Sequence, residues 1–96
     1  MNGHTFIFAK ITPKPKYFEV SKKAIKEIIS QTRNESGCLE FALHEDGVGS
    51  LYLYEEWIAD NALALHHKMD YTKAVFEAYT DWLATPPEIS KLMKLA

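Results

Sequence analysis

The 96-residue chain alternates between two hydrophobic periods, one typical of strands and one typical of helices. Residues 4–12, HTFIFAKIT, are rich in β-branched and aromatic side chains and end at a proline, so they predict a strand. From residue 17 the apolar positions recur at helical spacing, which predicts a helix that ends near Glu35. Gly37 follows, and we expect it to stop this helix in a left-handed conformation.

A hairpin is expected after this helix. In residues 38–45, CLEFALHE, the apolar side chains Leu39, Phe41 and Leu43 share one face of a predicted strand. An Asp-Gly turn signal then precedes a second alternating segment, residues 51–58, LYLYEEWI. Two strands joined by such a signal predict a hairpin.

The C-terminal part predicts two helical segments and a last strand. Asp60 and Asp70 are each expected to cap the start of a helical segment, and two consecutive prolines end the second one. Residues 88–95, EISKLMKL, are expected to form a short strand, with a helical turn or two as the alternative. Two helices against one face of an antiparallel sheet make an α+β fold. The sequence has no internal repeat and no long linker, so residues 1–96 are expected to form one domain.

Composition narrows the function classes. The net charge of −2 and the lack of a basic cluster interleaved with aromatics argue against nucleic-acid binding. No run approaches the roughly 18 apolar residues of a membrane span, and the N-terminus lacks a signal-peptide pattern, so we expect a cytoplasmic protein. Cys38 is the single cysteine and is expected to be a small buried residue rather than a nucleophile.

Charge is distributed unevenly along the chain. Residues 1–33 hold seven Lys or Arg and two acidic residues, whereas residues 34–96 hold four and eleven. Such a split would complement itself across a subunit interface, or it would reflect a solvated lysine face on the first helix. The sequence leaves both interpretations open.

Three chemistry-bearing side chains are predicted to share one interior. Strand alternation places Leu53, Glu55 and Trp57 on the same face. Helical spacing places His66 on an apolar stripe with Ala62, Leu65 and Met69, while His67 is rotated by about 100°. We therefore expect a carboxylate, an indole and an imidazole to meet beside the apolar residues of the hairpin and the following helix.

This grouping suits acid-base chemistry. Burial raises the pKa of a carboxyl group, and an imidazole starts at about 6.5, so both Glu55 and His66 would titrate near neutrality, where a general base works best. Trp57 would give a flat wall for a ring-shaped ligand, with Phe41, Leu53 and Met69 as further substrate contacts. The alternative is structural, with a hydrogen-bonded glutamate and a satisfied core histidine.

A metal site is the weaker interpretation of the same region. Its ligands would be Glu55, His66, His67 and Asp70. Adjacent helical histidines diverge, and the sequence has no HxxxH or HExxH spacing to hold an ion. We therefore expect no metal at this site.

Four ordered segments carry a resemblance to a known family. They are RNESGCLEF at 33–41, LYLYEEW at 51–57, ALALHHKMDYTKAVF at 62–76 and PPEI at 86–89. A helix ending in E-x-G-C, a strand ending in Y-E-x-W and a histidine nine residues after that tryptophan resemble the antibiotic biosynthesis monooxygenase (ABM) domain. The resemblance spans nearly the whole chain.

The resemblance implies a ferredoxin-like antiparallel sheet with helices on one face, paired into a dimeric α+β barrel with a cavity in each subunit. The family includes cofactor-independent enzymes that oxidise quinols or polyketide rings with molecular oxygen, relatives that degrade haem, and relatives that process a small autoinducer phosphate. Glu55, Trp57 and His66 match its recurrent pocket positions.

Two departures narrow the expected activity. Some polyketide-oxidising members have an asparagine four residues before the tryptophan, where this chain has Leu53. Haem-degrading members have an asparagine in the first strand, and TFIFAKI contains none. The resemblance is thus closer to the small quinol-oxidising or autoinducer-processing branch.

The sequence therefore predicts a homodimeric, cofactor-independent monooxygenase. Glu55 and His66 would exchange protons with a small electron-rich quinol or aromatic substrate beside Trp57, and molecular oxygen would be the second reactant. A non-oxidative isomerase of a small phosphorylated metabolite and a non-catalytic small-ligand-binding dimer are the alternatives.

Overall fold

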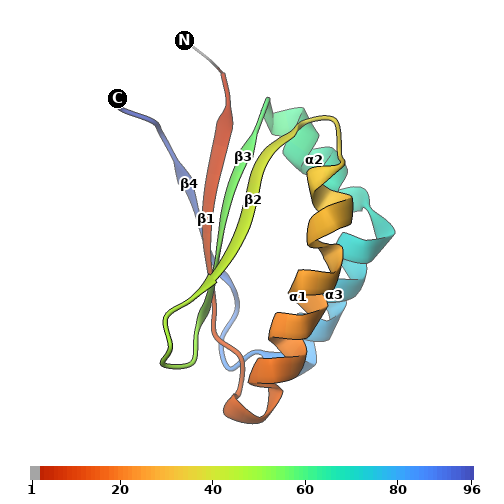
Figure 1. The fold of residues 1–96 in the computed structure, drawn as a ribbon, viewed down its shortest axis with the longest axis vertical. Helices are drawn as coiled ribbons and strands as arrows, with labels where there is room; N and C mark the ends of the chain where they lie inside the picture. Colours follow the sequence, from red (N-terminus) through yellow and green to blue (C-terminus); the bar gives the residue numbers. More distant parts are fainter. Residues whose placement is uncertain (1–2) are drawn as a thin grey trace.

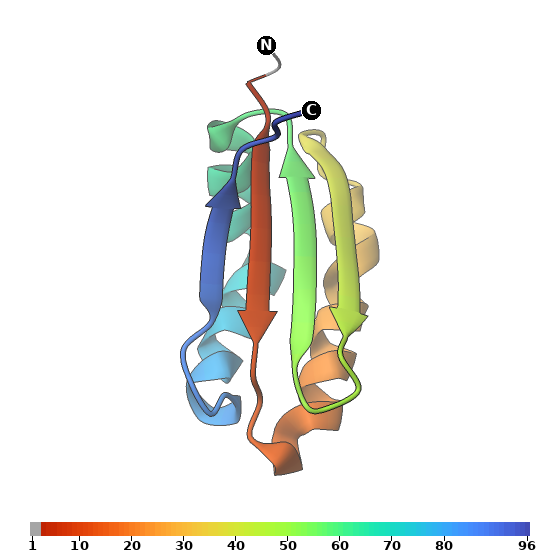
Figure 2. The same cartoon turned by 90° about the vertical axis from the view of Figure 1, so that its left-hand side faces the viewer.

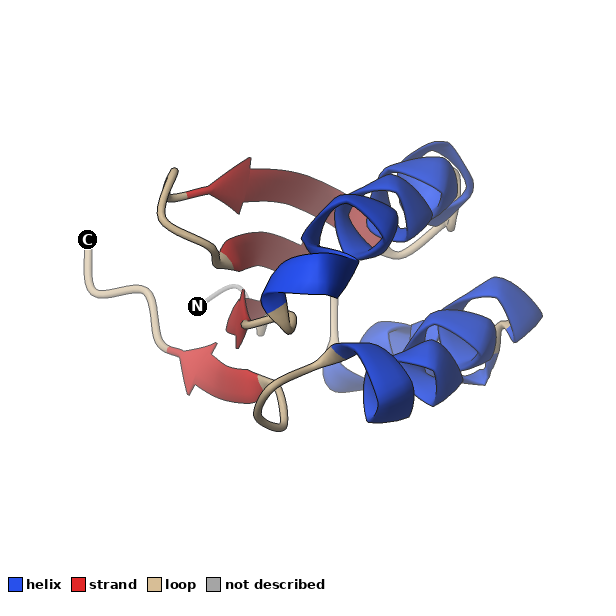
Figure 3. Cartoon of the chain, turned by 90° about the horizontal axis from the view of Figure 1, so that it is seen from below, coloured by secondary structure: helices blue, strands red, loops and turns tan. Residues whose placement is uncertain are grey.

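A computed structural model describes residues 3–96 as a sheet covered on one face by helices (Figure 1). The elements in chain order are β1 (Thr5–Ile11), the short 3-10 turn η1 (Pro15–Tyr17), α1 (Phe18–Arg33), β2 (Cys38–Glu45), β3 (Leu51–Trp57), α2 (Asp60–Lys68), α3 (Asp70–Trp82) and β4 (Glu88–Leu92). Seen from below, the helices form one layer and the strands the other (Figure 3).

The four strands pair antiparallel in the order β2-β3-β1-β4 (Figure 2). The Asp-Gly segment does connect β2 and β3 as a hairpin, with Gly47 at φ 78°. The last segment is a strand, β4, which pairs with β1 at one edge of the sheet. This order confirms the predicted ferredoxin-like α+β fold.

The core lies between the sheet and the helices. The strands contribute alternate side chains to it, and β3 follows the predicted alternation from Leu51 to Trp57 without interruption. Fully enclosed large side chains from both layers meet here: Ile11, Ile25, Phe41, Leu51 and Trp57. The face of β3 that carries Glu55 and Trp57 is therefore the helix-covered face.

Gly37 differs from the expectation, because its φ is not positive. A Cβ atom built on Gly37 would lie 2.3 Å from the Cβ atom of Ala62 in α2, which is closer than any real contact. Glycine is needed here so that the start of β2 can approach α2, rather than to end α1. The backbone N–H of Ile58 also donates to the carbonyl oxygen of Gly37, at 2.9 Å.

Both predicted helix caps are displaced by one residue. Asp60 and Asp70 are the first helical residues, after Ala59 and Met69, and neither N-terminus has a side-chain cap. The Asp60 carboxylate instead accepts hydrogen bonds from the Thr5 hydroxyl and the Lys91 ammonium group. Tertiary partners therefore outcompete the local cap at Asp60.

Leu39 and Leu65, both predicted to face the interior, are exposed instead. Leu39 is 47% exposed because the pairing of β2 with β3 shifts between Cys38 and Glu40, which interrupts the alternation. Leu65 is 57% exposed, and Leu63 packs against the core in its place. The buried stripe of α2 is therefore narrower than the predicted one and consists of Ala62 and His66.

Candidate active site

Glu55 lies inside the protein because β3 is a regular strand between two other strands. Its neighbours in register are Ile7 of β1 and Phe41 of β2, both buried, and Glu55 itself is only 6% exposed. Burial raises the pKa of the Glu55 carboxyl above its ordinary value of 4.5, against smaller lowering effects of Trp57 and His66. Burial therefore favours the protonated form of Glu55 more than it would for an exposed glutamate.

Trp57 holds Glu55 in place. The two residues are two positions apart on β3, so they share a face, and the indole N–H of Trp57 donates to Oε1 of Glu55 at 3.0 Å. Trp57 is fully buried. The indole is therefore a hydrogen-bond donor to the carboxyl group as well as an apolar surface.

His66 reaches the same interior from α2. His66 as a whole residue is 3% exposed. The centroid of its ring lies 4.8 Å from the ring centroid of Trp57 and 5.5 Å from that of Phe41. One helical turn earlier, Ala62 packs on Gly37. This close contact sets the distance of α2 from the sheet and with it the depth of His66.

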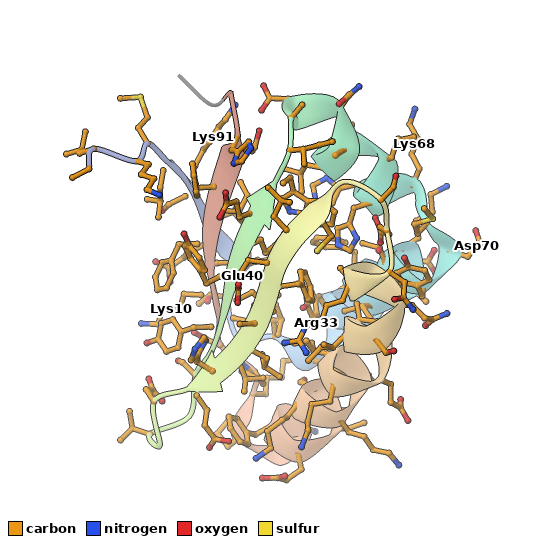
Figure 4. All side chains as sticks on the ribbon, turned by 45° about the horizontal axis from the view of Figure 1, so that its top comes forward. Lys10, Arg33, Glu40, Lys68, Asp70 and Lys91 are labelled. Atoms are coloured by element: carbon orange, nitrogen blue, oxygen red, sulfur yellow. The ribbon has the colours of Figure 1, made fainter. Side chains whose placement is uncertain are left out.

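Glu35 and Tyr71 were not predicted from the sequence, yet both belong to the surroundings of His66. Oε2 of Glu35 lies 2.8 Å from Nδ1 of His66, and the Tyr71 hydroxyl donates to the same oxygen. The helix α1 ends at Arg33, whose Nε donates to the carbonyl oxygen of Phe41 at 3.0 Å (Figure 4). The chain beyond α1 is thus anchored to β2, and Glu35 follows in this anchored segment.

A cavity of about 70 Å³ lies between the sheet and the helices. Its lining includes four residues that the sequence predicted for the site, namely Phe41, Leu53, Glu55 and His66. The other lining residues are Ile7, Ala9, Ile11, Ile25, Ile28, Leu63, His67, Thr72, Val75, Phe76, Tyr79, Pro87 and Ile89. The structure therefore brings these four predicted residues together. Most of the lining is apolar, and it includes no lysine or arginine.

Two of the predicted substrate contacts lie outside this lining. Trp57 packs behind it, against the ring of His66 and the carboxyl group of Glu55. Met69 lies at the junction of α2 and α3, where its extended backbone ends the helix before it can face the cavity. His67, expected to point elsewhere, lines the cavity together with Phe76, with the two rings edge to face at 5.7 Å.

The remaining polar groups of the cavity are uncharged donors. Burial raises the pKa of the Tyr79 hydroxyl well above its ordinary value, so Tyr79 stays a phenol. Burial also lowers the pKa of His67, with a smaller contribution from His66. Burial thus favours the neutral forms of Tyr79 and His67, so both present uncharged polar groups to a ligand.

Cys38 lies outside the cavity and is partly buried. Burial, followed by the charges of Glu35 and Glu55, raises the pKa of its thiol to about 11. A protonated thiol is a poor nucleophile, which agrees with the structural role expected for Cys38.

Asp70, one of the four residues of the disfavoured metal set, lies apart from the other three. Asp70 projects from the junction of α2 and α3 on the side away from the sheet (Figure 4). Within residues 3–96, no three His, Cys, Asp or Glu side chains are grouped to hold an ion. The buried Glu55 and His66 are instead partnered by the side chains of Trp57 and Glu35.

Comparison with known families shows which family the chain belongs to. Residues 5–78 match the antibiotic biosynthesis monooxygenase (ABM) family. The chain belongs to the ABM family. The matched range, residues 5–78, includes Glu55 and His66 and the side chains that contact them, Glu35, Trp57 and Tyr71.

Solved structures share the ABM-type fold over the full length. PA3566 from Pseudomonas aeruginosa is 26% identical, with a TM-score of 0.92, and the alignment covers 100% of this chain and 98% of that one. A conserved protein from Methanosarcina mazei is 25% identical, with a TM-score of 0.88 and coverage of 98% and 95%. A further structure, described as an antibiotic biosynthesis monooxygenase, is 19% identical, with a TM-score of 0.88 and coverage of 96% and 99%.

No curated protein matches the chain.

Within residues 3–96, none of the helices has the length and apolar character needed to cross a membrane. The cytoplasmic location of this ABM protein remains a prediction.

Proposed function

We propose that this ABM protein is a cofactor-independent monooxygenase of a small, uncharged, electron-rich hydroquinone or phenol. The observation that carries the proposal is the convergence of Glu55 and His66 on one apolar cavity, backed by the indole of Trp57. When the hydroxyl group of such a substrate loses its proton, the resulting electron-rich anion can reduce molecular oxygen directly.

The proposed roles of Glu55 and His66 are complementary. Because burial raises the pKa of Glu55, this residue is suited to donate a proton, and His66 is suited to accept one. His66 would take the hydroxyl proton of the substrate, and the electron pair of the resulting anion would add to O2 at a ring carbon that carries hydrogen. The peroxide anion formed in this step takes the proton back from His66 and becomes a hydroperoxide.

The second half of the reaction returns the protons. His66 removes the hydrogen of the hydroperoxide carbon as a proton, the O–O bond breaks, and the distal oxygen leaves as water with a proton from Glu55. The proton held by His66 then restores Glu55, so both residues return to their starting states. One oxygen atom stays on the ring as a carbonyl group, so substrate and O2 yield hydroxylated quinone and water in balance. The apolar cavity favours this course because it excludes the water that would quench the anion.

The charge of the cavity argues against the phosphorylated-metabolite alternative. A phosphate group needs lysine, arginine or a cluster of backbone N–H groups to offset its charge. The cavity lining contains neither cation and includes the carboxyl group of Glu55. We therefore favour an uncharged ring over a phosphorylated substrate.

A binding protein without turnover is the second candidate. It is favoured by the small number of polar groups in the cavity, since Glu55 and His66 each already have a hydrogen-bonding partner. Thermal-shift screening of aromatic metabolites, followed by turnover assays on each ligand found, separates the two functions. Binding without consumption supports the second.

Oxygen consumption tests the proposed function. In an oxygen electrode with menadiol, the protein should accelerate uptake above the spontaneous rate, and isotopically labelled O2 should leave one labelled atom in the product and one in water. Uptake equal to the spontaneous rate, or stoichiometric hydrogen peroxide with no label in the product, would contradict monooxygenation.

We also propose that the protein is a homodimer that pairs through the outer face of its sheet. Phe8 and Leu92 are about two-fifths exposed on this face, and the Phe8 ring stacks on Tyr52 with centroids 5.7 Å apart. The neighbouring Lys10 and Glu40 extend away from the helices as well (Figure 4). An aromatic surface with charged residues around it is typical of a subunit interface.

A further inference from the structure

Three polar side chains from separate parts of the chain meet behind His66. Glu35 comes from the segment between α1 and β2, His66 from α2 and Tyr71 from α3. The side chains of His66 and Glu35 are 4% and 8% exposed, and neither Glu35 nor Tyr71 lines the cavity. The 2.8 Å contact between Nδ1 of His66 and Oε2 of Glu35 is therefore a buried interaction, unlike a solvent-screened surface pair.

The contact fixes the imidazole ring in two ways. Its Nδ1 atom is held by Glu35, and its faces and edges are confined by the rings of Trp57 and Phe41, at centroid distances of 4.8 and 5.5 Å. The Thr72 hydroxyl, 3.4 Å from the same nitrogen, is the more distant neighbour. With Nδ1 engaged, Nε2 is the ring nitrogen left for a ligand in the cavity that His66 lines.

We propose that Glu35 is a positioning residue that keeps the hydrogen of neutral His66 on Nδ1, so that Nε2 presents its lone pair to the substrate. This inference rests on the proposed function, in which His66 is the base. The tautomer of a histidine is set by the hydrogen bond of its other nitrogen, and a carboxylate on Nδ1 also stabilises the imidazolium ion after proton transfer. The transferred proton is held on Nε2 until it returns to the peroxide, and it does not pass to Glu35.

Tyr71 supports this arrangement from the other side. Burial, followed by the interaction with Glu35, raises the pKa of Tyr71 well above its ordinary value, so its hydroxyl stays protonated and donates. Oε2 of Glu35 consequently accepts from Tyr71 and, as proposed, from His66. These two contacts hold the Glu35 side chain in place behind His66.

The two glutamates near His66 therefore have different roles. Glu55 lines the cavity and is held by the indole of Trp57, whereas Glu35 lies outside the cavity and is held by Tyr71. Glu55 contacts the substrate as the proton donor, and Glu35 acts through His66.

Proton–nitrogen correlation NMR of the histidine side chains tests the inference without any substrate. At alkaline pH, neutral His66 of the wild type should carry its hydrogen on Nδ1. In Glu35→Leu the acceptor is lost, and His66 should shift to the Nε2–H form that free histidine prefers. Glu27→Leu, at an exposed glutamate of α1, is the matched control and should leave the His66 signal unchanged.

Steady-state kinetics with a hydroquinone substrate give the second readout. Glu35→Leu should lower kcat by about a hundredfold or more with little change in KM, because Nε2 no longer has a free lone pair. Glu35→Gln keeps a carbonyl acceptor but loses the charge, so it should keep the Nδ1–H form and lower kcat by about tenfold, the difference between a charged and a neutral hydrogen-bond acceptor. It also serves as the informative variant if Glu35→Leu does not fold.

The outcomes separate the inference from the proposed function. An Nε2–H form in the wild type, an unchanged His66 signal in Glu35→Leu, or a Glu35→Gln enzyme with unchanged kcat would each overturn the role of Glu35. If the wild type oxidises no hydroquinone while the NMR signals behave as expected, the function fails and the tautomer assignment stands.

Discussion

Gly37 and Ala62 meet so closely that only one of the two positions can carry a side chain. The Cβ atom that Gly37 lacks would lie 2.3 Å from that of Ala62, while its next neighbours, Ile58 and the Ala62 backbone, would be at ordinary contact distances. The contact joins the start of β2 to α2, one helical turn before His66. The depth of the proposed base is therefore fixed by a glycine outside the cavity.

Gly37→Ala should consequently push α2 away from the sheet. We expect a loss of about 1–3 kcal/mol in the free energy of unfolding, as for other overpacked sites, measured by urea denaturation. The double variant Gly37→Ala/Ala62→Gly should recover part of that loss, although glycine in a helix itself costs about 1 kcal/mol. If the two changes simply add, the contact between these residues does not determine the helix position.

Burial of Glu55 predicts a pH-dependent effect of Glu55→Gln. Because the pKa of Glu55 is raised in the folded protein, ionisation opposes folding once the pH exceeds the ordinary value of 4.5, and the carboxyl contributes most stability below it. Glutamine carries no charge, so the stability of Glu55→Gln relative to the wild type should increase as the pH rises above the ordinary value of 4.5.

Urea denaturation across this pH range measures the effect. Glu27→Gln, at an exposed glutamate of α1, is the matched control and should show little pH-dependent difference from the wild type. A Glu55→Gln difference that is constant with pH would mean that Glu55 is not ionising under a burial penalty.

Phe76 predicts a change in substrate size preference. The cavity is smaller than most ligand pockets, which occupy roughly 300–1,000 Å³, and Phe76 lines it while remaining 39% exposed. Phe76→Ala should widen the opening and raise kcat/KM for two-ring hydroquinones by about tenfold relative to single-ring ones. Steady-state kinetics with a one-ring and a two-ring hydroquinone measure this change. An equal change in kcat/KM for both substrates would show that Phe76 does not limit the opening of the cavity.

The proposed dimer predicts that Phe8→Asp is a monomer. A charge in the centre of the apolar sheet face would be buried without a partner on association, which strongly opposes pairing. Light scattering at micromolar concentration should show a wild-type dimer and a Phe8→Asp monomer. Val20→Asp changes a similarly exposed apolar residue of α1 and should remain dimeric. A monomeric wild type would refute the assembly.

Periodicity predicted which side chains face inward within a regular element. Strand alternation placed Leu53, Glu55 and Trp57 correctly on the buried face, and helical spacing placed His66 there. The pattern failed at Leu39, where a register shift interrupts the alternation, and at Met69, where α2 ends. A local period carries no information about where the element stops being regular.

The support of the site could not be predicted in the same way. Glu35 lies between α1 and β2, where no repeat defines a face, and its contacts with His66 and Tyr71 span more than thirty residues of sequence. The E-x-G-C motif was visible, but the use of Gly37 depends on how closely β2 approaches α2. Such approaches follow from tertiary packing rather than from the local sequence.

Turnover by the double variant Glu55→Gln/His66→Ala tests the central claim most directly. With both proton-exchanging groups removed, enzyme-dependent oxygen uptake with menadiol should fall by about 100-fold or more, whereas His44→Ala, at an exposed histidine of β2, should retain the wild-type rate. Circular dichroism confirms that the variants are folded. Uptake by the folded double variant at the wild-type rate would show that these two residues do not perform the chemistry.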